Sequence, residues 1–206
     1  MEFACSHVHW QNSDWNKVIF SDEKKWNLCG NDGYAKIWKD NTMVYTQESE
    51  QFLRGGIMVW GAILSTGSVV IAWVKQNITS KVYVQVIDGT LFKNDDVVFP
   101  SNYIFMQDNA APHRAKHTMQ YLDGLDIEVL TWPAKSPDLN PIENLWGIVT
   151  RAIYIGGKTY KNADELWEAV SEEFMKIPKS TIENLYKSLP GRMVKVLESG
   201  GKRINY

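Results

Sequence analysis

Two short apolar runs in this sequence each lead into an acidic residue. Residues 18–20 (Val-Ile-Phe) are followed by Ser21 and Asp22, and residues 103–106 (Tyr-Ile-Phe-Met) are followed by Gln107 and Asp108. Apolar runs of this length are typical of buried strands, and α/β sheets bind ligands beyond the carboxyl ends of their strands. We therefore expect each acid to lie at the end of a strand, with the two strands adjacent in the centre of one sheet.

The remaining patterns alternate between strands and helices. Residues 57–64 and 68–74 flank Ser-Thr-Gly and predict a hairpin, and residues 127–132 predict a further strand. Helical spacing or capping signals predict helices after Ser80, over 115–122, from Asn140 to about 154, over 163–175, and over 179–189, the last closed by Pro190 and Gly191. This order predicts an α/β layered domain rather than a bundle or a sandwich.

Composition limits the class of protein. A chain of 206 residues with 44% hydrophobic residues can bury a sizeable core, so we expect residues 1–206 to form a single domain. The formal net charge of −2 lacks the basic excess of a complete nucleic-acid-binding protein. With two cysteines, no apolar run long enough for a membrane span and no signal peptide at the start, the sequence predicts a cytosolic or nuclear protein without membrane association.

A third acid, Glu143, completes a candidate cation site. Hard cations such as Mg²⁺ take oxygen ligands, and two such ions can drive phosphodiester chemistry without a protein nucleophile. Other interpretations remain open at this level. Asp22 can be a solvated strand-end acid, Glu143 can form a capping box with Asn140 three residues earlier, and Asp138 competes as the third ligand.

Several motifs around these acids resemble those of the Tc and mariner group of DDE transposases. The first is Ser-Asp-Glu-Lys-Lys-Trp-Asn-Leu at 21–28, followed by Val-Trp-Gly at 59–61. The second is Gln-Asp-Asn at 107–109 with His113, and the third runs from Trp132 to Trp146. The interval between Asp108 and Glu143 is similar to that of the Tc-like branch, in which glutamate is the third ligand.

The resemblance implies a ribonuclease-H-like fold, with a mixed central sheet flanked by helices, C-terminal helices over about 161–198, and a clamp-loop insertion at about 39–56. It implies that Asp22, Asp108 and Glu143 are catalytic and bind Mg²⁺ or Mn²⁺, as two ions. The implied reaction is cleavage of DNA at transposon ends and transfer of the 3′ hydroxyl into target DNA, usually at a TA dinucleotide. The clamp loop implies a homodimer on DNA, and the group's N-terminal helix-turn-helix domain is expected to be absent from this chain.

Three further residues are candidate DNA contacts: His113, Arg114 and Lys135. His113 can alternatively orient Asp108, and the two cations can belong to a solvated face. Two other functions share these features, namely a domesticated or decayed transposase that acts as a DNA-associated scaffold, and a ribonuclease-H-like nuclease without strand transfer. A transposase would act in the nucleus, or in the cytoplasm of a bacterium.

Overall fold

The computed structural model describes residues 1–30 and 55–205. The predicted clamp loop at 39–56 lies outside the described residues except for Gly55 and Gly56. Within the described residues, no helix is both long and apolar enough to cross a membrane. Neither Cys5 nor Cys29 forms a disulfide in the described part of the chain.

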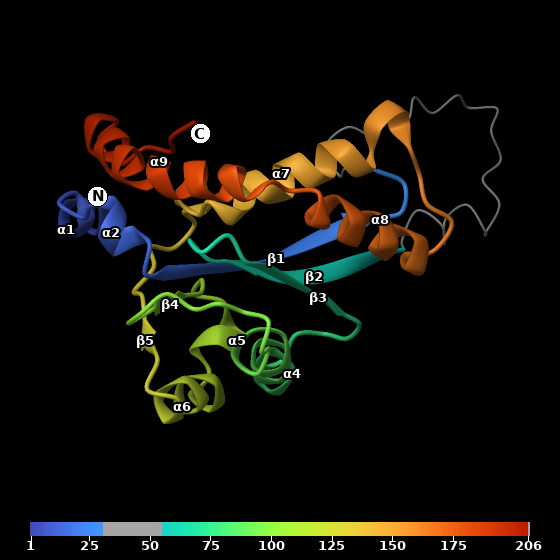
Figure 1. Cartoon of the computed structure of the whole chain (residues 1–206), viewed down its shortest axis with the longest axis horizontal. Coiled ribbons are helices and arrows are strands. Elements are labelled where there is room, and N and C mark those ends of the chain that lie inside the picture. Colours follow the sequence, from blue (N-terminus) through green and yellow to red (C-terminus); the bar gives the residue numbers. More distant parts are fainter. Residues whose placement is uncertain (31–54, 206) are drawn as a thin grey trace.

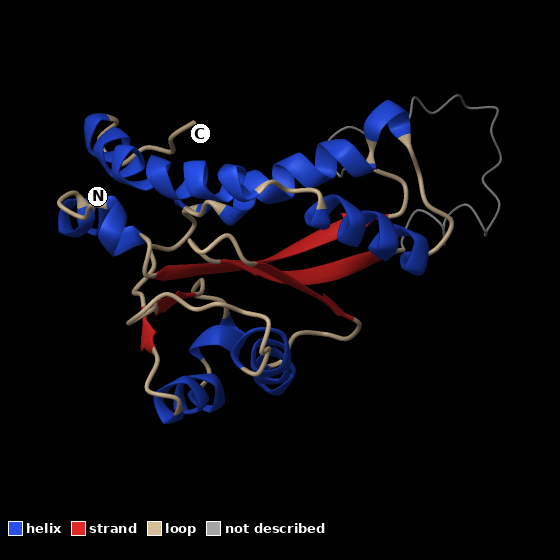
Figure 2. Cartoon of the chain, viewed as in Figure 1, coloured by secondary structure: helices blue, strands red, loops and turns tan. Residues whose placement is uncertain are grey.

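Five strands form one mixed sheet in the order β3-β2-β1-β4-β5 (Figure 2). Their bounds are β1 (Val18–Asn27), β2 (Gly56–Ile63), β3 (Val69–Val74), β4 (Ile104–Met106) and β5 (Glu128–Val129). The central strand β1 pairs antiparallel with β2 and parallel with β4. The predicted hairpin is confirmed as β2 and β3, and the predicted adjacency of the two acid-bearing strands is confirmed as β1 and β4.

Helices cover both faces of this sheet (Figure 1). On one face lie α7 (Ile142–Ile153), α8 (Ala163–Met175) and α9 (Lys179–Glu198), with the short α1 (Glu2–His7) and α2 (Asn12–Trp15) packed against α9. On the other face lie α4 (Ser80–Ile87), which continues into the π-helical turn η1 (Asp88–Phe92), α5 (Ala111–Arg114) and α6 (Lys116–Gly124). Two 3-10 turns, η2 (Pro137–Leu139) and η3 (Ile155–Gly157), flank α7.

The two faces bury separate apolar clusters because successive side chains of a strand point to opposite sides. Phe20 of β1 packs in the cluster beneath α7 to α9, whereas its neighbour Ile19 packs in the cluster beneath α4 to α6. In the first cluster the rings of Trp26 and Trp146 meet edge to face, with centroids 5.4 Å apart. Fixing α7 against β1 in this way determines where the first turn of α7 lies.

Three predicted boundaries were wrong. β1 does not end at Asp22 but continues to Asn27, because β2 pairs with it as far as that residue. The strand predicted over 127–132 is reduced to the two residues of β5. The last helix does not stop at Pro190 but runs through it to Glu198, since Leu189 and Met193 on either side are fully buried. Tertiary packing outweighs the helix-breaking tendency of proline there.

Candidate active site

Asp22, Asp108 and Glu143 line one cavity of about 300 Å³. Asp22 comes from β1, Asp108 from the loop after β4, and Glu143 from the first turn of α7. The other walls include Asn140 and the segment from Trp132 to Pro137. Residues far apart in the sequence therefore meet in a single open site beside the carboxyl end of β4.

The parallel register of β1 and β4 brings the two aspartates together. Phe20 pairs with Met106, and each aspartate follows its paired residue by two positions. Asp22 nevertheless lies inside a strand, because only the parallel partner of β1 stops before it. The expectation of neighbouring acids is thus met, although only Asp108 follows the end of its strand.

Asp22 is held on the α7 side of the sheet. Its Oδ2 accepts a hydrogen bond of 3.0 Å from Trp146 Nε1. Gly61 lies opposite Asp22 on β2, and a Cβ at that glycine would lie 2.7 Å from Cη2 of Trp146. Burial, together with the negative charges of Glu143 and Glu23, raises the pKa of Asp22 to about 7, against the lowering effect of two hydrogen bonds.

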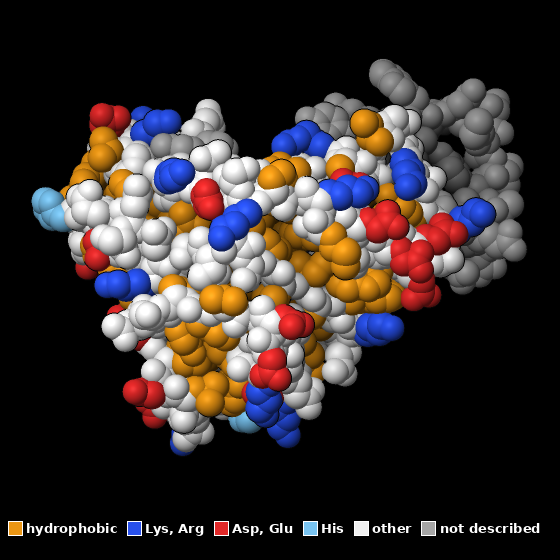
Figure 3. All heavy atoms as spheres, viewed as in Figure 1, with side chains coloured by type: hydrophobic (Ala, Val, Ile, Leu, Met, Phe, Trp, Pro, Cys, Tyr) orange, Lys and Arg blue, Asp and Glu red, His pale blue; other side chains and the backbone are white. Residues whose placement is uncertain are grey.

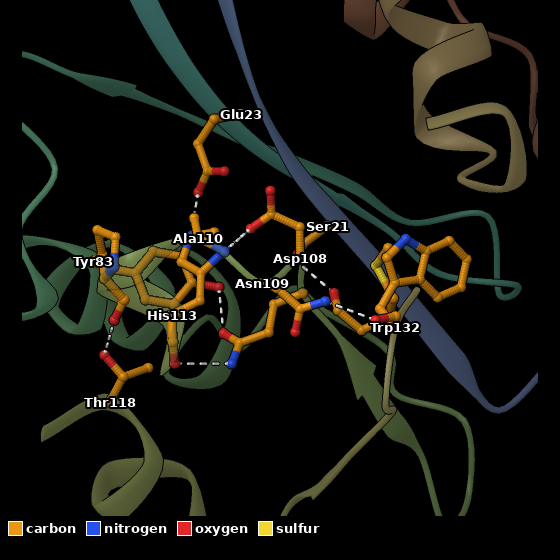
Figure 4. A network of polar contacts seen from close by, with 12 residues as sticks. Ser21, Glu23, Tyr83, Asp108, Asn109, Ala110, His113, Thr118 and Trp132 are labelled. Atoms are coloured by element: carbon orange, nitrogen blue, oxygen red, sulfur yellow. Dashed lines mark hydrogen bonds and ion pairs between the residues drawn. The ribbon is translucent and has the colours of Figure 1, made fainter. Parts of the chain in front are cut away.

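Asp108 is half exposed and is positioned through a single oxygen. Its Oδ1 accepts hydrogen bonds from the backbone N–H of Ala110, at 2.8 Å, and from His113 Nδ1, at 2.6 Å (Figure 4). These bonds, with the His113 bond as the main cause, lower the pKa of Asp108 and keep its carboxylate ionised. Its Oδ2 has no hydrogen-bond partner among the described residues and faces a site lined by two other acids.

His113 links Asp108 to a fourth acid, Glu23. The imidazole is only 3% exposed, and its Nε2 lies 3.2 Å from Oε1 of Glu23 (Figure 4). The ring of Tyr83 packs on it at a centroid distance of 4.1 Å. Burial alone would lower the His113 pKa, but the hydrogen bonds and charges of Asp108 and Glu23 raise it to about 9. The imidazole is therefore a cation at neutral pH that donates from both nitrogens.

These contacts favour the orienting role of His113 over a direct contact with DNA, since both ring nitrogens already face carboxylates. The two other candidate DNA contacts, Arg114 and Lys135, are exposed. Lys135 lines the cavity and has a positive φ of 56°, whereas Arg114 lies on α5 outside the cavity lining. Glu23 was not among the site residues predicted from the sequence. The strand alternation that sends Asp22 toward α7 also sends Glu23 toward α5, and that pattern was visible in the sequence.

Glu143 does not act as a capping-box residue here. Among the described residues its side chain makes no hydrogen bond. The helix start is instead held by Asn140, whose Oδ1 accepts from the N–H of Ile142 at 3.3 Å and whose Nδ2 donates to the carbonyl of Ser21 at 3.1 Å. Asn140 therefore ties the residue before Asp22 to the residue before Glu143. Burial raises the pKa of Glu143, and the charges of Lys24 and Arg203 oppose that rise.

The competing acid, Asp138, points elsewhere. Its Oδ2 accepts a hydrogen bond of 2.8 Å from the backbone N–H of Ile204 in the C-terminal tail. Its own carbonyl accepts from Arg192 Nη1 at 3.0 Å. Asp138 thus serves to anchor the tail, and it is absent from the residues that line the cavity.

The three cavity acids do not form a closed ligand set by themselves. Within residues 1–30 and 55–205, no group of three or more His, Cys, Asp or Glu side chains is close enough to hold a metal ion unaided. Mg²⁺ commonly takes one or two carboxylates and completes its shell with water and substrate phosphate oxygens. The open, half-exposed arrangement is compatible with that mode of binding.

Comparisons with known proteins agree with this geometry. A family profile described as "DDE superfamily endonuclease" matches residues 17–167. The chain is 36% identical to the Tc3 transposase of Caenorhabditis elegans, covering all of this chain and 62% of that protein. It is 30% identical to the Tcb2 transposase of Caenorhabditis briggsae, covering 99% of this chain and 76% of that protein.

Solved structures of the Mos1 transposase share the fold. The Mos1 paired-end complex with the left transposon end superposes with a TM-score of 0.75 at 20% identity, over 99% of this chain and 60% of that chain. The Mos1 catalytic domain solved with Raltegravir and Mn gives a TM-score of 0.73 at 17% identity, over 99% and 94% of the two chains. This agreement confirms the ribonuclease-H-like fold. The chain spans about three fifths of the length of the Tc3 transposase and of the Mos1 chain in the paired-end complex.

Proposed function

Because this chain belongs to the DDE superfamily of endonucleases, in its Tc/mariner branch, we propose that it is the catalytic domain of a transposase. The proposed reaction is cleavage of DNA at transposon ends, followed by transfer of the liberated 3′ hydroxyl into target DNA. The observation that carries the proposal is the convergence of Asp22, Asp108 and Glu143 on one open cavity.

The donor set fits divalent cations. Asp22 is largely buried beside other carboxylates, and among the described residues it forms no salt bridge with a lysine or arginine. An ionised carboxylate in such a place is destabilised unless a positive charge joins it. We assign Asp22, Asp108 and Glu143 as ligands of Mg²⁺ or Mn²⁺, bound as two ions. Such ions supply activation of the attacking oxygen and stabilisation of the leaving oxygen.

The protein's own contribution is to hold these carboxylates in place. Trp146 fixes Oδ2 of Asp22, and His113 fixes Oδ1 of Asp108 and leaves Oδ2 of the latter for a cation. Asn140 bonds to the carbonyl of Ser21 on β1 and to the N–H of Ile142 on α7, which ties the backbone that carries Asp22 to the backbone that carries Glu143. Hydrogen-bonded partners of this kind typically account for 10- to 100-fold of cation affinity or activity.

The proposal extends to the partners of the site. DNA would enter past the exposed Lys135 and Arg114, with transposon ends and target TA sites as substrates. The segment at 39–56 would clamp a second copy of the chain on DNA. In a eukaryotic host this work takes place in the nucleus, and in a bacterium it takes place in the cytoplasm.

A plasmid assay tests the proposed chemistry. The chain is incubated with supercoiled plasmid and Mn²⁺, and nicking is compared with that of Asp108→Asn and of the matched exposed control Asp95→Asn. We expect the wild type and the Asp95→Asn control to nick the plasmid and Asp108→Asn not to. EDTA should abolish the nicking. If the wild type does not nick and binds Mn²⁺ no better than Asp108→Asn, the chain is a scaffold rather than an enzyme.

A second measurement separates transposase from nuclease. A labelled duplex that ends in a free 3′ hydroxyl at a transposon end is supplied with a plasmid that contains TA sites. Covalent joining of the label to the plasmid is expected of a transposase. Nicking without any joining would assign the chain to the nucleases.

A further inference from the structure

A second cavity adjoins the proposed active site. It measures about 460 Å³ and shares Pro137 and Glu143 with the cavity of the three acids. Two arginines line it, Arg192 from α9 and Arg203 from the C-terminal tail, together with Asp138, whose Oδ2 is engaged by the backbone N–H of Ile204. A linear polyanion lying across the three carboxylates would therefore meet positive charge directly beyond Glu143.

The C-terminal tail is folded back to bring Arg203 to this place. After α9 ends, Gly200 and Gly201 adopt positive φ values of 67° and 82°, which reverse the chain at little steric cost. Ile204 is then 7% exposed, and its N–H donates to Oδ2 of Asp138 at 2.8 Å. Figure 1 shows the end of the chain lying back along α9 toward α7. The backbone of Arg203 is thus positioned by the turn at Gly200 and Gly201 before it and by the buried Ile204 after it, not by contacts of the Arg203 side chain.

The two arginines have different roles. Arg192 is 1% exposed. Its guanidinium donates to Ser188 Oγ at 3.0 Å, to the carbonyl of Asp138 at 3.0 Å and to Asn144 Oδ1 at 2.7 Å. Arg192 therefore stabilises the wall of the cavity. Arg203 is exposed, and within the described part of the chain its side chain makes no hydrogen bond or salt bridge. The positive charge of Arg203 nevertheless acts on the Glu143 carboxyl, where it opposes the rise in pKa that burial causes.

We infer that this second cavity is a DNA-phosphate subsite in which Arg203 binds a backbone phosphate beside the one at the three carboxylates. The inference rests on the proposed function, because it assumes that the strand to be cut crosses Glu143. A guanidinium is suited to this task, since its planar fork matches two phosphate oxygens at once. A chain with a formal net charge of −2 also needs local cations to hold a polyanion next to three acids.

Binding of a fluorescein-labelled DNA duplex to the full chain, followed by anisotropy in EDTA over a range of NaCl concentrations, tests this inference. We expect Arg203→Gln to weaken binding roughly tenfold, as for one lost charge-assisted hydrogen bond. The logarithm of the DNA association constant decreases as the logarithm of the salt concentration increases. In Arg203→Gln the magnitude of this slope should be smaller by about 1, the value for one lost phosphate contact. Arg203→Lys should keep the slope, and Lys202→Gln is the matched control, since it removes the same charge from an exposed neighbour outside the cavity lining.

Equal losses in Arg203→Gln and Lys202→Gln, or an unchanged slope in Arg203→Gln, would overturn the subsite. So would a wild-type chain that binds no DNA. The plasmid assay keeps this result apart from the proposed function. If the wild type nicks plasmid but Arg203→Gln leaves its DNA affinity unchanged, the catalytic proposal stands and the phosphate subsite is wrong. If the salt dependence of DNA binding changes in Arg203→Gln but the wild type never nicks plasmid, Arg203 contacts DNA and the proposed catalytic function is wrong.

Discussion

Replacing Asp22 with asparagine should stabilise the metal-free protein at neutral pH. The folded chain holds this carboxyl at a pKa of about 7, against an ordinary value of 3.8. That difference corresponds to about 4 kcal/mol of unfolding free energy. Because the side chain is partly exposed, we expect a gain of about 2 to 4 kcal/mol in the variant.

The sign of the effect follows from where the proton is held. Well below pH 3.8 Asp22 is protonated in both the folded and the unfolded chain, so its pKa difference has no effect on stability. Between pH 4 and pH 7 the unfolded chain ionises first, and stability falls as pH rises; above pH 7 the full cost is present. The advantage of Asp22→Asn should therefore be near zero at pH 4 and largest above pH 7.

Urea unfolding monitored by tryptophan fluorescence in EDTA measures this difference, with the exposed Asp95→Asn as control. In that control we expect little change with pH. An Asp22→Asn advantage that does not grow between pH 4.5 and pH 8 would show that the folded protein does not raise the pKa of Asp22. Added Mn²⁺ should reverse the order at pH 8, because each tenfold excess of cation over its Kd stabilises the wild type by about 1.4 kcal/mol, whereas the variant has lost a ligand.

Three other substitutions test the scaffold of the site. Glu23→Gln removes the second carboxylate partner of His113 and should lower plasmid nicking about 10- to 100-fold, with DNA affinity unchanged. Gly61→Ala places a Cβ 2.7 Å from the Trp146 ring and should cost about 1 to 3 kcal/mol in urea unfolding while also lowering nicking. Arg192→Met removes three hydrogen bonds beneath the start of α7 and should cost about 3 kcal/mol of stability.

Each of these predictions has a clear contrary result. Full nicking by Glu23→Gln would show that the link from Glu23 through His113 does not position Asp108. A Gly61→Ala variant as stable as the wild type would mean that the Trp146 ring can move aside. Arg192→Met with unchanged stability would mean that water replaces the lost donors. Gly147→Ala, on the same helix as Trp146, offers a control for the second variant, since its added Cβ would approach no atom closer than 3.5 Å.

Part of the site could be predicted because its signals are local. The apolar runs before Asp22 and Asp108 mark strands through their own composition, and parallel neighbouring strands place such residues side by side. Asn140 and the residues after it mark the start of a helix in the same local way. The resemblance of these motifs to a known group then raised the three acids above other acids in the chain.

Other features depended on partners distant in the sequence. The length of β1 is determined by pairing with β2, and the passage of α9 through Pro190 is determined by buried neighbours on either side. The different places of Glu143, which lines the cavity, and of Asp138, whose carboxylate accepts from the N–H of the tail residue Ile204, also depend on contacts between segments distant in the sequence.

The fold class and the candidate acids Asp22, Asp108 and Glu143 were therefore accessible from the sequence, since they follow from short-range periodicity and from the resemblance of contiguous motifs to a known group. Three properties of the site came only from the folded chain: the burial of His113 between Asp108 and Glu23, the raised pKa of Asp22 and the position of Arg203 in a cavity shared with Glu143. Those properties depend on distance and desolvation between elements far apart in the chain, and neither quantity is encoded in the spacing of residues.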